Sequence, residues 1–292
     1  MKNPKSLFVL PLAALSLASC GSQSAGKDIT IDGQSFHVEV GKMVIGMECD
    51  YAPFNWTATA ADDYTLPIST GGYADGYDIQ MAKRLSTIMG LDVSIVREKW
   101  ESLIPDCQMD SINMVIAGMT DTEERRESIA FSDPYFTSEV VLLSKASVAN
   151  TYQGQTLGRE DLGTLLSGRL VVSQKDTVED EIINNFVTDY GCQHASAQTT
   201  YGLAADDVRN GSADFLVVEL PVAQAYVSNY ADSVGIVHIS QDILGVSKAE
   251  LSVSIGVKKE NTGLVAALNA ALSQISADDR TTLMTAAVER AN

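Results

Sequence analysis

Short apolar runs alternate with segments of helical periodicity along most of this chain, and this alternation limits its fold more than any other feature. The predicted strands cover residues 43–47, 93–96, 113–117, 140–144, 170–173, 215–218 and 253–257. The predicted helices cover residues 79–90, 100–109, 122–127, 177–190, 201–210, 221–230, 264–275 and 279–290. Such alternation predicts an α/β fold with largely parallel sheets. Because it restarts after residue 146, we predict two lobes.

Local signals add three smaller expectations. Residues 29–40 alternate around an Asp-Gly turn, which predicts a β-hairpin. Residues 52–76 are rich in Gly, Thr, Asp and Pro and are predicted to form a long loop. Asp78 is predicted to cap the helix that follows it, and Gly90 to end that helix.

The charge of the chain is strongly one-sided, with 20 Lys and Arg residues against 38 Asp and Glu residues and a net charge of −18. Such a surface repels a phosphate backbone, so we expect no nucleic-acid partner. The excess of acids gives a weak bias toward cationic small molecules. The hydrophobic fraction of 45% excludes disorder through most of the chain.

The chain begins with a basic stretch, an apolar run of 11 residues at 7–17, and the sequence Leu-Ala-Ser-Cys that ends at Cys20. This run is too short to span a bilayer, and the order of the three parts is typical of a secretory signal. The ending resembles the lipobox of bacterial lipoproteins. The resemblance implies a signal peptide at 1–19, a lipid on Cys20 and an extracytoplasmic protein anchored to the cell membrane. An ordinary signal peptide with an incidental Cys is the alternative.

Common catalytic signatures are absent from the sequence. It has no G-x-x-x-x-G-K-[ST] phosphate loop and no G-x-S-x-G nucleophile motif. Its three His residues do not lie at metal-ligand spacing, so we expect neither a metal nor a cofactor. Cys49, Cys107 and Cys192 allow either one disulfide and one free thiol, or three buried thiols that pack as small apolar residues.

Five short runs suit the binding of a small zwitterion. They are residues 48–56 (ECDYAPFNW), 76–82 (GYDIQMA), 100–105 (WESLIP), 110–125 (DSINMVIAGMTDTEER) and 131–136 (FSDPYF). In this order, they resemble the polar amino-acid binding proteins of bacterial ABC importers, which are family 3 solute-binding proteins of the lipoprotein type. The resemblance extends from about residue 41 to the C-terminus.

The resemblance implies a periplasmic-binding-protein type II fold, in which two α/β lobes, each a mostly parallel sheet flanked by helices, are joined by two hinge strands. It assigns residues 41–142 and 257–292 to lobe one and residues 147–252 to lobe two. The hinges are expected near residues 143–146 and 253–256. Residues 20–40 then hold the lipidated Cys, a tether and the hairpin.

Arg125 is the candidate partner for the α-carboxylate of the ligand. Its guanidinium offers a bidentate fork, and the matching Arg of the family binds this carboxylate. A surface Arg that pairs with Glu123 or Glu124 is the alternative. Backbone groups and one hydroxyl just before Arg125 are further candidates: Ala117, Gly118, Met119 and Thr120.

Lobe two is expected to supply Glu219, Thr177 and Val178. Glu219 ends a predicted strand, and the family usually has an Asp here that binds the α-ammonium. The alternative is an exposed Glu at the end of the strand. Thr177 and Val178 lie in the run QKDTVE, which matches a Gly-Thr turn of the family except that Asp176 replaces the Gly. Asp tolerates unusual backbone angles, but its charge opposes a carboxylate unless it points away.

Glu48, Tyr51 and Trp100 match positions around the ligand's side chain. Two aromatic faces hold an alkyl or cationic group, and an acid at the far end favours a cation. Trp56 is a further candidate wall. The alternative for Tyr51 and Trp100 is a role only in the core.

The resemblance therefore implies a monomeric amino-acid receptor of an ABC importer, which passes its ligand to a permease and its ATPase. A cationic L-amino acid such as arginine or lysine is expected first and glutamine next. Two alternatives share the fold: a periplasmic cyclohexadienyl or arogenate-type dehydratase, and a ligand sensor that is not coupled to uptake.

Overall fold

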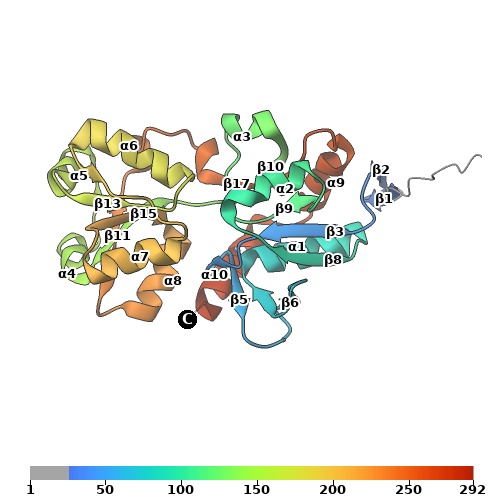
Figure 1. Cartoon of the computed structure of the whole chain (residues 1–292), viewed down its shortest axis with the longest axis horizontal. Helices are drawn as coiled ribbons and strands as arrows, with labels where there is room; N and C mark the ends of the chain where they lie inside the picture. The colour runs from blue at the N-terminus through green and yellow to red at the C-terminus, as the bar shows by residue number, and fades with distance from the viewer. Residues whose placement is uncertain (1–25, 292) are drawn as a thin grey trace, which may run out of the picture.

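The structure is a computed structural model that describes residues 26–291, which form two α/β lobes side by side (Figure 1). The predicted signal segment 1–19 and Cys20 lie outside the described residues, so the lipid anchor stays a prediction. None of the helices in residues 26–291 is long and apolar enough to cross a membrane.

Lobe one is built on a five-stranded sheet with the order β10-β17-β9-β3-β8. Its strands are β3 (Met43–Met47), β8 (Val93–Arg97), β9 (Met114–Val115), β10 (Ile129–Thr137) and β17 (Ser252–Lys258). Its helices are α1 (Tyr77–Met89), α2 (Leu103–Gln108), α3 (Glu123–Ser128) and α9 (Thr262–Leu272), with a 3-10 turn at Trp100–Ser102. As the helical spacing predicts, α1 buries one apolar face and ends at Gly90, whose φ is 62°.

The stretch predicted as one long loop contains a small sheet instead. Its strands, in the order β4-β5-β7-β6, are β4 (Asp50–Tyr51), β5 (Asn55–Ala58), β7 (Tyr73–Asp75) and β6 (Leu66–Pro67). These strands have two to four residues each, too few to show an alternating pattern, so the Gly-rich and Pro-rich composition concealed them. The prediction of a loop at 52–76 is therefore wrong in part.

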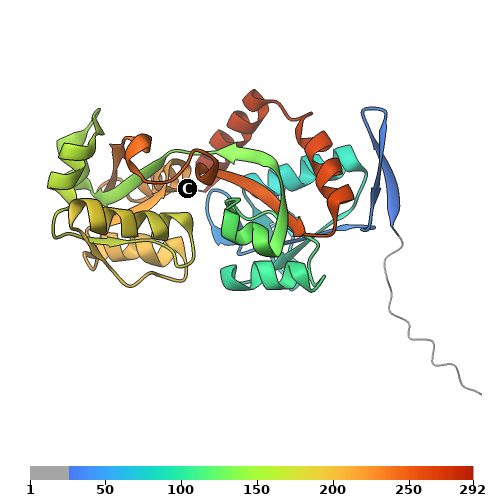
Figure 2. The same cartoon turned by 90° about the horizontal axis from the view of Figure 1, so that it is seen from above.

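The predicted N-terminal hairpin is confirmed as β1 (Lys27–Ile31) and β2 (Gln34–Val38). It lies at the outer end of lobe one, far from the other lobe (Figures 1 and 2). The hairpin packs tightly on α9, because a Cβ at Gly263 would lie 2.2 Å from the carbonyl oxygen of His37.

Lobe two is built on a six-stranded sheet with the order β12-β16-β11-β15-β13-β14. Its strands are β11 (Val140–Lys145), β12 (Thr156–Leu157), β13 (Leu170–Val172), β14 (Gln193–His194), β15 (Phe215–Glu219) and β16 (Val234–Ile239). Its helices are α4 (Ala146–Ala149), α5 (Arg159–Leu166), α6 (Val178–Tyr190), α7 (Tyr201–Asn210) and α8 (Leu220–Tyr230). Short 3-10 turns cover Asn150–Tyr152, Gln241–Ile243 and Ala249–Leu251.

Both sheets are mixed, and their antiparallel pairs have a common cause. Strands β10, β11 and β17 take part in every antiparallel pair of the two large sheets, while the other pairs are parallel. β11 and β17 each enter from the other lobe and run against the direction of the helix-connected strands of their sheet. β10, which leaves toward lobe two, is antiparallel to β17 and therefore runs in the same direction as β9. The parallel pairs are those that helical crossovers join, as expected for α/β units.

The two crossings lie earlier in the chain than the positions at which we expect the hinges. All of β11 pairs with β15 and β16, so residues 143–145 belong to the sheet of lobe two. Residues 253–256 pair with β10 in the sheet of lobe one. The chain therefore crosses between Thr137 and Val140 and returns just before Ser252. Figure 2 shows the chain passing from one lobe to the other and back.

The last helix, α10 (Ala277–Arg290), contacts both lobes, although the sequence assigns it to lobe one. Arg290 forms a salt bridge with Asp75 of lobe one, with an Nε–Oδ2 distance of 2.8 Å. Asn229 of α8 donates to the carbonyl oxygen of Ala291, 3.0 Å away. In Figure 1, α10 accordingly lies between the lobes.

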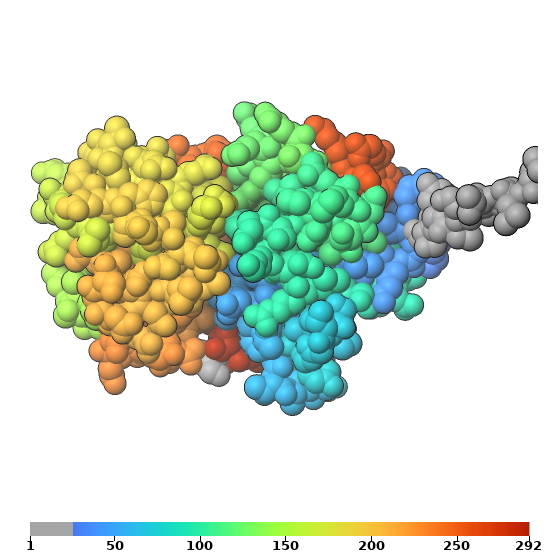
Figure 3. All heavy atoms as spheres, viewed as in Figure 1, coloured from blue at the N-terminus to red at the C-terminus, as the bar shows by residue number. Residues whose placement is uncertain are grey.

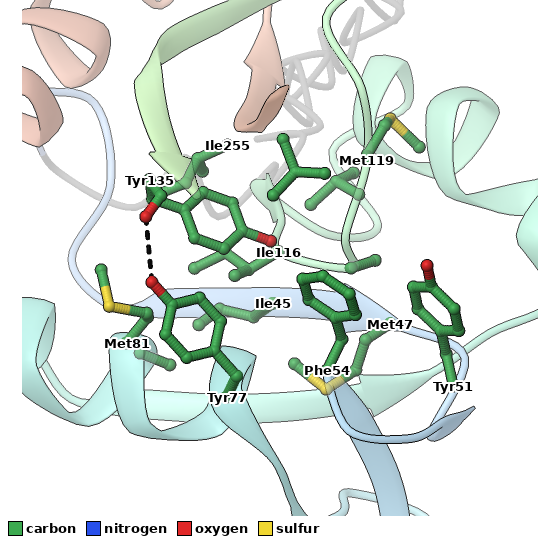
Figure 4. Packing of buried hydrophobic residues seen from close by; sticks show 14 of the residues in the cluster. Ile45, Met47, Tyr51, Phe54, Tyr77, Met81, Ile116, Met119, Tyr135 and Ile255 are labelled. Atoms are coloured by element: carbon green, nitrogen blue, oxygen red, sulfur yellow. Dashed lines mark hydrogen bonds between the residues drawn. The ribbon is translucent and has the colours of Figure 1, made fainter. Parts of the chain in front are cut away.

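A row of aromatic rings leads from the core of lobe one to the boundary between the lobes (Figure 4). Tyr77 stacks on Tyr135, and Phe54 meets Tyr77 edge to face at 6.2 Å between centroids. Tyr51 stacks on Phe54 at 5.0 Å and on Tyr201 of lobe two at 4.8 Å. Tyr51 is therefore part of the core and also one face of the cleft.

Candidate functional site

A narrow cavity of only about 10 Å³ between the lobes gathers most of the predicted site residues. Figure 3 shows the two lobes meeting closely along their boundary on the visible face. Lobe one contributes Glu48, Tyr51, Trp100, Gly118, Thr120 and Arg125. Lobe two contributes Gln174, Thr177, Val178, Tyr201 and Glu219. Ala117 and Met119 do not line the cavity, because their side chains are buried in the core of lobe one.

Arg125 lies in the first turn of α3 and extends across the boundary between the lobes. Its Nη1 donates to the carbonyl oxygen of Thr120 at 2.8 Å, and its Nη2 donates to that of Asp176 in lobe two at 3.0 Å. Its guanidinium lies over the ring of Trp100, 5.2 Å from the centroid. Burial lowers the pKa of Arg125. No carboxylate of residues 26–291 forms a salt bridge with Arg125, so it does not pair with Glu123 or Glu124.

Glu219 and Glu179 are two buried carboxyl groups on the lobe-two side of the cavity. The hydroxyl of Tyr51 donates to Glu219 across the boundary, and that of Tyr201 donates to Glu179 at 2.8 Å. Burial, followed by the charge of Glu179, raises the pKa of Glu219 well above its ordinary value. Burial also raises the pKa of Glu179. Glu219 is thus a buried group, and the alternative of an exposed strand end is wrong.

Glu48 is the third buried carboxyl of the cleft, at the end near Trp100. Its Oε1 accepts a hydrogen bond of 3.0 Å from Nε2 of Gln174 in lobe two. Burial raises the pKa of Glu48 to about 7, against the opposing effect of this hydrogen bond. Glu48 and Trp100 also line a second, more open cavity of about 420 Å³.

A buried network holds the two lobe-one segments that line the cavity. Asp78 accepts hydrogen bonds from Asn55 at 2.8 Å and from the hydroxyl of Tyr135 at 2.7 Å. That hydroxyl accepts from the backbone N–H of Gly118 at 3.0 Å. The prediction that Asp78 caps α1 is wrong. The residue before the helix is Gly76, and no side chain caps the helix there. The backbone N–H of Gly118 is thus already hydrogen-bonded within the protein.

Only glycine fits at position 118, for two reasons. Its φ is 61°, in the left-handed region, and a Cβ there would lie 2.7 Å from Cε1 of Tyr51. The turn after β9 therefore brings its backbone against the aromatic wall only because the side chain is absent.

The lobe-two turn before α6 has an Asp where the resemblance implies a Gly, and its backbone there lies in the left-handed region. Asp176, which replaces a Gly, has a φ of 61°. Its carboxylate is 57% exposed and lies 3.5 Å from Nζ of Lys175, so its charge points away from the cleft. Thr177 caps α6 by accepting from the N–H of Asp180, and its hydroxyl donates to the carbonyl oxygen of Gln174.

Comparison with known proteins identifies the family. The family model of the bacterial extracellular solute-binding proteins, family 3, matches residues 43–286. The chain belongs to this family. The expected type II periplasmic-binding fold is likewise confirmed by its structural neighbours.

Among relatives of this solute-binding protein, the arginine-binding extracellular protein ArtP of Bacillus subtilis is 24% identical over 94% of this chain and 93% of its own length. The ABC transporter glutamine-binding protein GlnH of the same organism is 26% identical over 96% of this chain and 94% of its own length. A crystal structure of the amino-acid ABC transporter substrate-binding protein AbpA of Streptococcus pneumoniae, bound to L-arginine, matches with a TM-score of 0.69. That match is 22% identical and covers 86% of this chain and 96% of that one.

Three residues of this solute-binding protein's cleft escaped the sequence analysis: Gln174, Glu179 and Tyr201. Gln174 and Glu179 flank the recognised turn in QKDTVE, and Glu179 looks there like an ordinary acid in the first turn of a helix. Tyr201 follows the cap residue Thr200, so the sequence signals only the start of a helix. No local sequence pattern indicates that these three side chains are buried, or that Gln174 and Tyr201 contact lobe one.

The remaining expectations concern metals and thiols. No group of His, Cys, Asp and Glu residues within 26–291 is arranged to hold a metal ion. Cys49, Cys107 and Cys192 are free and buried, which agrees with the interpretation as small apolar residues.

Proposed function

We propose that this solute-binding protein captures an L-amino acid with a cationic side chain, with arginine or lysine favoured and glutamine next, and delivers it to an ABC permease. Catalysis forms no part of the proposal. The chain would be a monomer, held at the outer face of the membrane by a lipid on Cys20. Its family binds amino acids for ABC transport, while the choice of ligand and the anchor are proposals.

The charge balance of the cleft carries this proposal. Arg125 faces the cavity together with Glu48 and Glu219, and Glu179 lies just behind the wall. An amino acid with a neutral side chain adds no net charge, whereas arginine or lysine adds one positive charge to this acidic surrounding. Because buried carboxylates need a cation or several donors, the excess of acids favours a cationic ligand.

Each part of such a ligand has a candidate partner. Arg125 offers a charged fork for the α-carboxylate, and Glu219 with the hydroxyl of Tyr51 offers acceptors for the α-ammonium. The side chain would lie along Trp100 and reach Glu48, where the second cavity gives room for a long side chain.

Binding to the purified protein is the test of ligand class. A thermal-shift screen against the twenty amino acids should give the largest stabilisation with arginine or lysine, of about 2.7 kcal/mol at 100 times the dissociation constant. Glutamate and aspartate should give none, because their carboxylates would face Glu48. Tighter binding of glutamate than of arginine in calorimetry would contradict the proposal.

The role of Glu48 can be tested separately. Glu48→Gln should narrow the difference in affinity between arginine and glutamine, because the amide still accepts a hydrogen bond but carries no charge. Calorimetry with both ligands on the parent and the variant measures this difference. An unchanged ratio of the two dissociation constants would show that the ligand's side chain does not reach Glu48.

Two further assays test the remaining parts of the proposal. Turnover of arogenate or prephenate by the purified protein would favour the dehydratase alternative, in which an acid such as Glu219 donates a proton. For the anchor, Cys20→Ser should abolish lipid labelling and signal processing. Unchanged labelling would place the lipid elsewhere.

A further inference from the structure

Four side chains form one buried cluster where the lobes meet. The rings of Tyr51 and Tyr201 are stacked at 4.8 Å, and each hydroxyl donates to one carboxyl group. Tyr51 donates to Glu219, and Tyr201 donates to Glu179 at an oxygen–oxygen distance of 2.8 Å. Two acids from α6 and the end of β15 are thereby held against the same pair of rings.

This cluster contains two acids and no salt bridge. Glu179 is 6% exposed and Glu219 is 7% exposed. Within residues 26–291, no Lys, Arg or His nitrogen lies within salt-bridge distance of either carboxyl. Arg125 attracts Glu179, but its guanidinium donates to backbone carbonyl groups instead. Two neighbouring buried carboxylates cannot both ionise cheaply, so such a pair retains a proton.

We infer that Glu179 and Glu219 share one proton in the ligand-free protein, and that the α-ammonium of an amino acid displaces it, so that binding releases a proton to the solvent. One carboxylic O–H bond breaks, and the ammonium takes over the neutralising charge. Glu179 does not line the cavity and acts through Glu219 and Tyr201, so it is a positioning residue. The inference rests on the proposed function, because it requires an amino-acid ammonium in the cleft.

Other titratable groups surround the pair, and the experiment has to distinguish any proton that they release from the proton of the pair. Tyr51 and Tyr201 contact it directly, Arg125 faces it from α3, and Asp78 of α1 acts on Glu219 through its charge. Glu48 is the competitor, since it also has a reason to lose a proton when a cationic side chain arrives. Glutamine distinguishes the two sources, because it has the α-ammonium but no cationic side chain.

Calorimetry of the full chain in detergent, in two buffers of different ionisation enthalpy near pH 7, measures the proton. Glutamine should release up to about one proton, and its affinity should rise up to about tenfold per pH unit over the range of release. Glu179→Gln should bind glutamine with little release, because the amide still accepts from Tyr201 but removes the second charge. Glu160→Gln, the same change at an exposed site on α5, should behave like the parent. Equal release from the parent and Glu179→Gln would overturn the inference.

A second measurement needs no ligand. In an acid–base titration from pH 9 to pH 6, the parent should take up more protons than Glu179→Gln, by up to about one per chain. Identical curves would also overturn the shared proton. If the curves differ but neither arginine nor glutamine binds, the proposed ligand class is wrong, while the proton shared by Glu179 and Glu219 is supported. The release is then measured with whichever of the twenty amino acids binds.

Discussion

Two neighbouring arginines of α3 have the same chemistry and opposite surroundings. Arg126 is 64% exposed and forms a bidentate pair with Asp121, with Nε–Oδ1 and Nη2–Oδ2 distances of 2.5 Å. Arg125 instead contacts backbone carbonyl groups of both lobes and the face of Trp100. A carboxylate entering the cleft would meet a guanidinium whose charge is not yet paired, which is the condition for strong binding.

Arg125→Ala should therefore weaken amino-acid binding by about 2–5 kcal/mol, which is roughly 30-fold or more in dissociation constant, because it leaves the ligand's carboxylate unpaired. Arg126→Ala is the matched control and should change binding little, since Arg126 is 64% exposed and does not line the cavity. Calorimetry on both variants makes the comparison. Equal losses would mean that the α-carboxylate binds elsewhere.

At the scale of elements, the segment before α6 shows how one turn joins the two lobes. The carbonyl oxygen of Asp176 accepts from Nη2 of Arg125 and from Nε1 of Trp100 at 3.1 Å. Both donors belong to lobe one, so the left-handed backbone at Asp176 aims a lobe-two carbonyl across the boundary. The side chain of Asp176 takes no part in this contact.

This geometry predicts a graded response to substitution. Asp176→Gly should keep ligand binding, because Gly adopts a positive φ without a steric cost. Asp176→Val should lower the free energy of unfolding by about 1–2 kcal/mol or more and weaken binding, because a β-branched residue resists this conformation. Chemical denaturation and calorimetry measure both effects. A Val variant that matches the Gly variant would show that the turn does not depend on its backbone angle.

For the whole molecule, buried acids and excess negative charge act on stability in the same direction. Burial raises the pKa of Glu48 and that of Asp78 to about 7, from ordinary values of 4.5 and 3.8. A carboxyl with a raised pKa in the folded state contributes stability that is fully present at low pH, below its unfolded value. That contribution is lost as the pH rises through about 7. The net charge of −18 adds repulsion that also grows with pH.

The ligand-free protein should consequently become more stable as the pH falls from about 8.5 to about 5.5. Each proton taken up on folding adds about 1.4 kcal/mol per pH unit to the free energy of unfolding. Melting temperatures across this range measure the trend, and Glu48→Gln should make it shallower. A melting temperature that falls steadily from pH 8.5 to pH 5.5 would contradict the assignment of these buried acids.

Much of the architecture follows from local sequence patterns, and the candidate residues of lobe one follow from the resemblance of short runs to the family. The alternation of strands and helices predicts two α/β lobes because each segment must bury an apolar face, and that requirement is written in its own periodicity. Arg125, Tyr51 and Gly118 are predicted because they stand in short runs that resemble those of the family. The tolerance of Asp for a left-handed angle at 176 is a property of the residue itself.

Only the tertiary structure determines which side chains contact one another and in which direction burial shifts the pKa of each acid. Tyr51 reaches Glu219 across 168 positions of sequence, and Gln174 reaches Glu48 across 126. Glu179 has the sequence position of a surface acid in the first turn of a helix, but the folded chain buries it. The positions of the crossings likewise depend on which strands pair, not on any local signal. Burial and charge coupling are properties of the surroundings in space, and residues distant in sequence supply those surroundings only after the chain has folded.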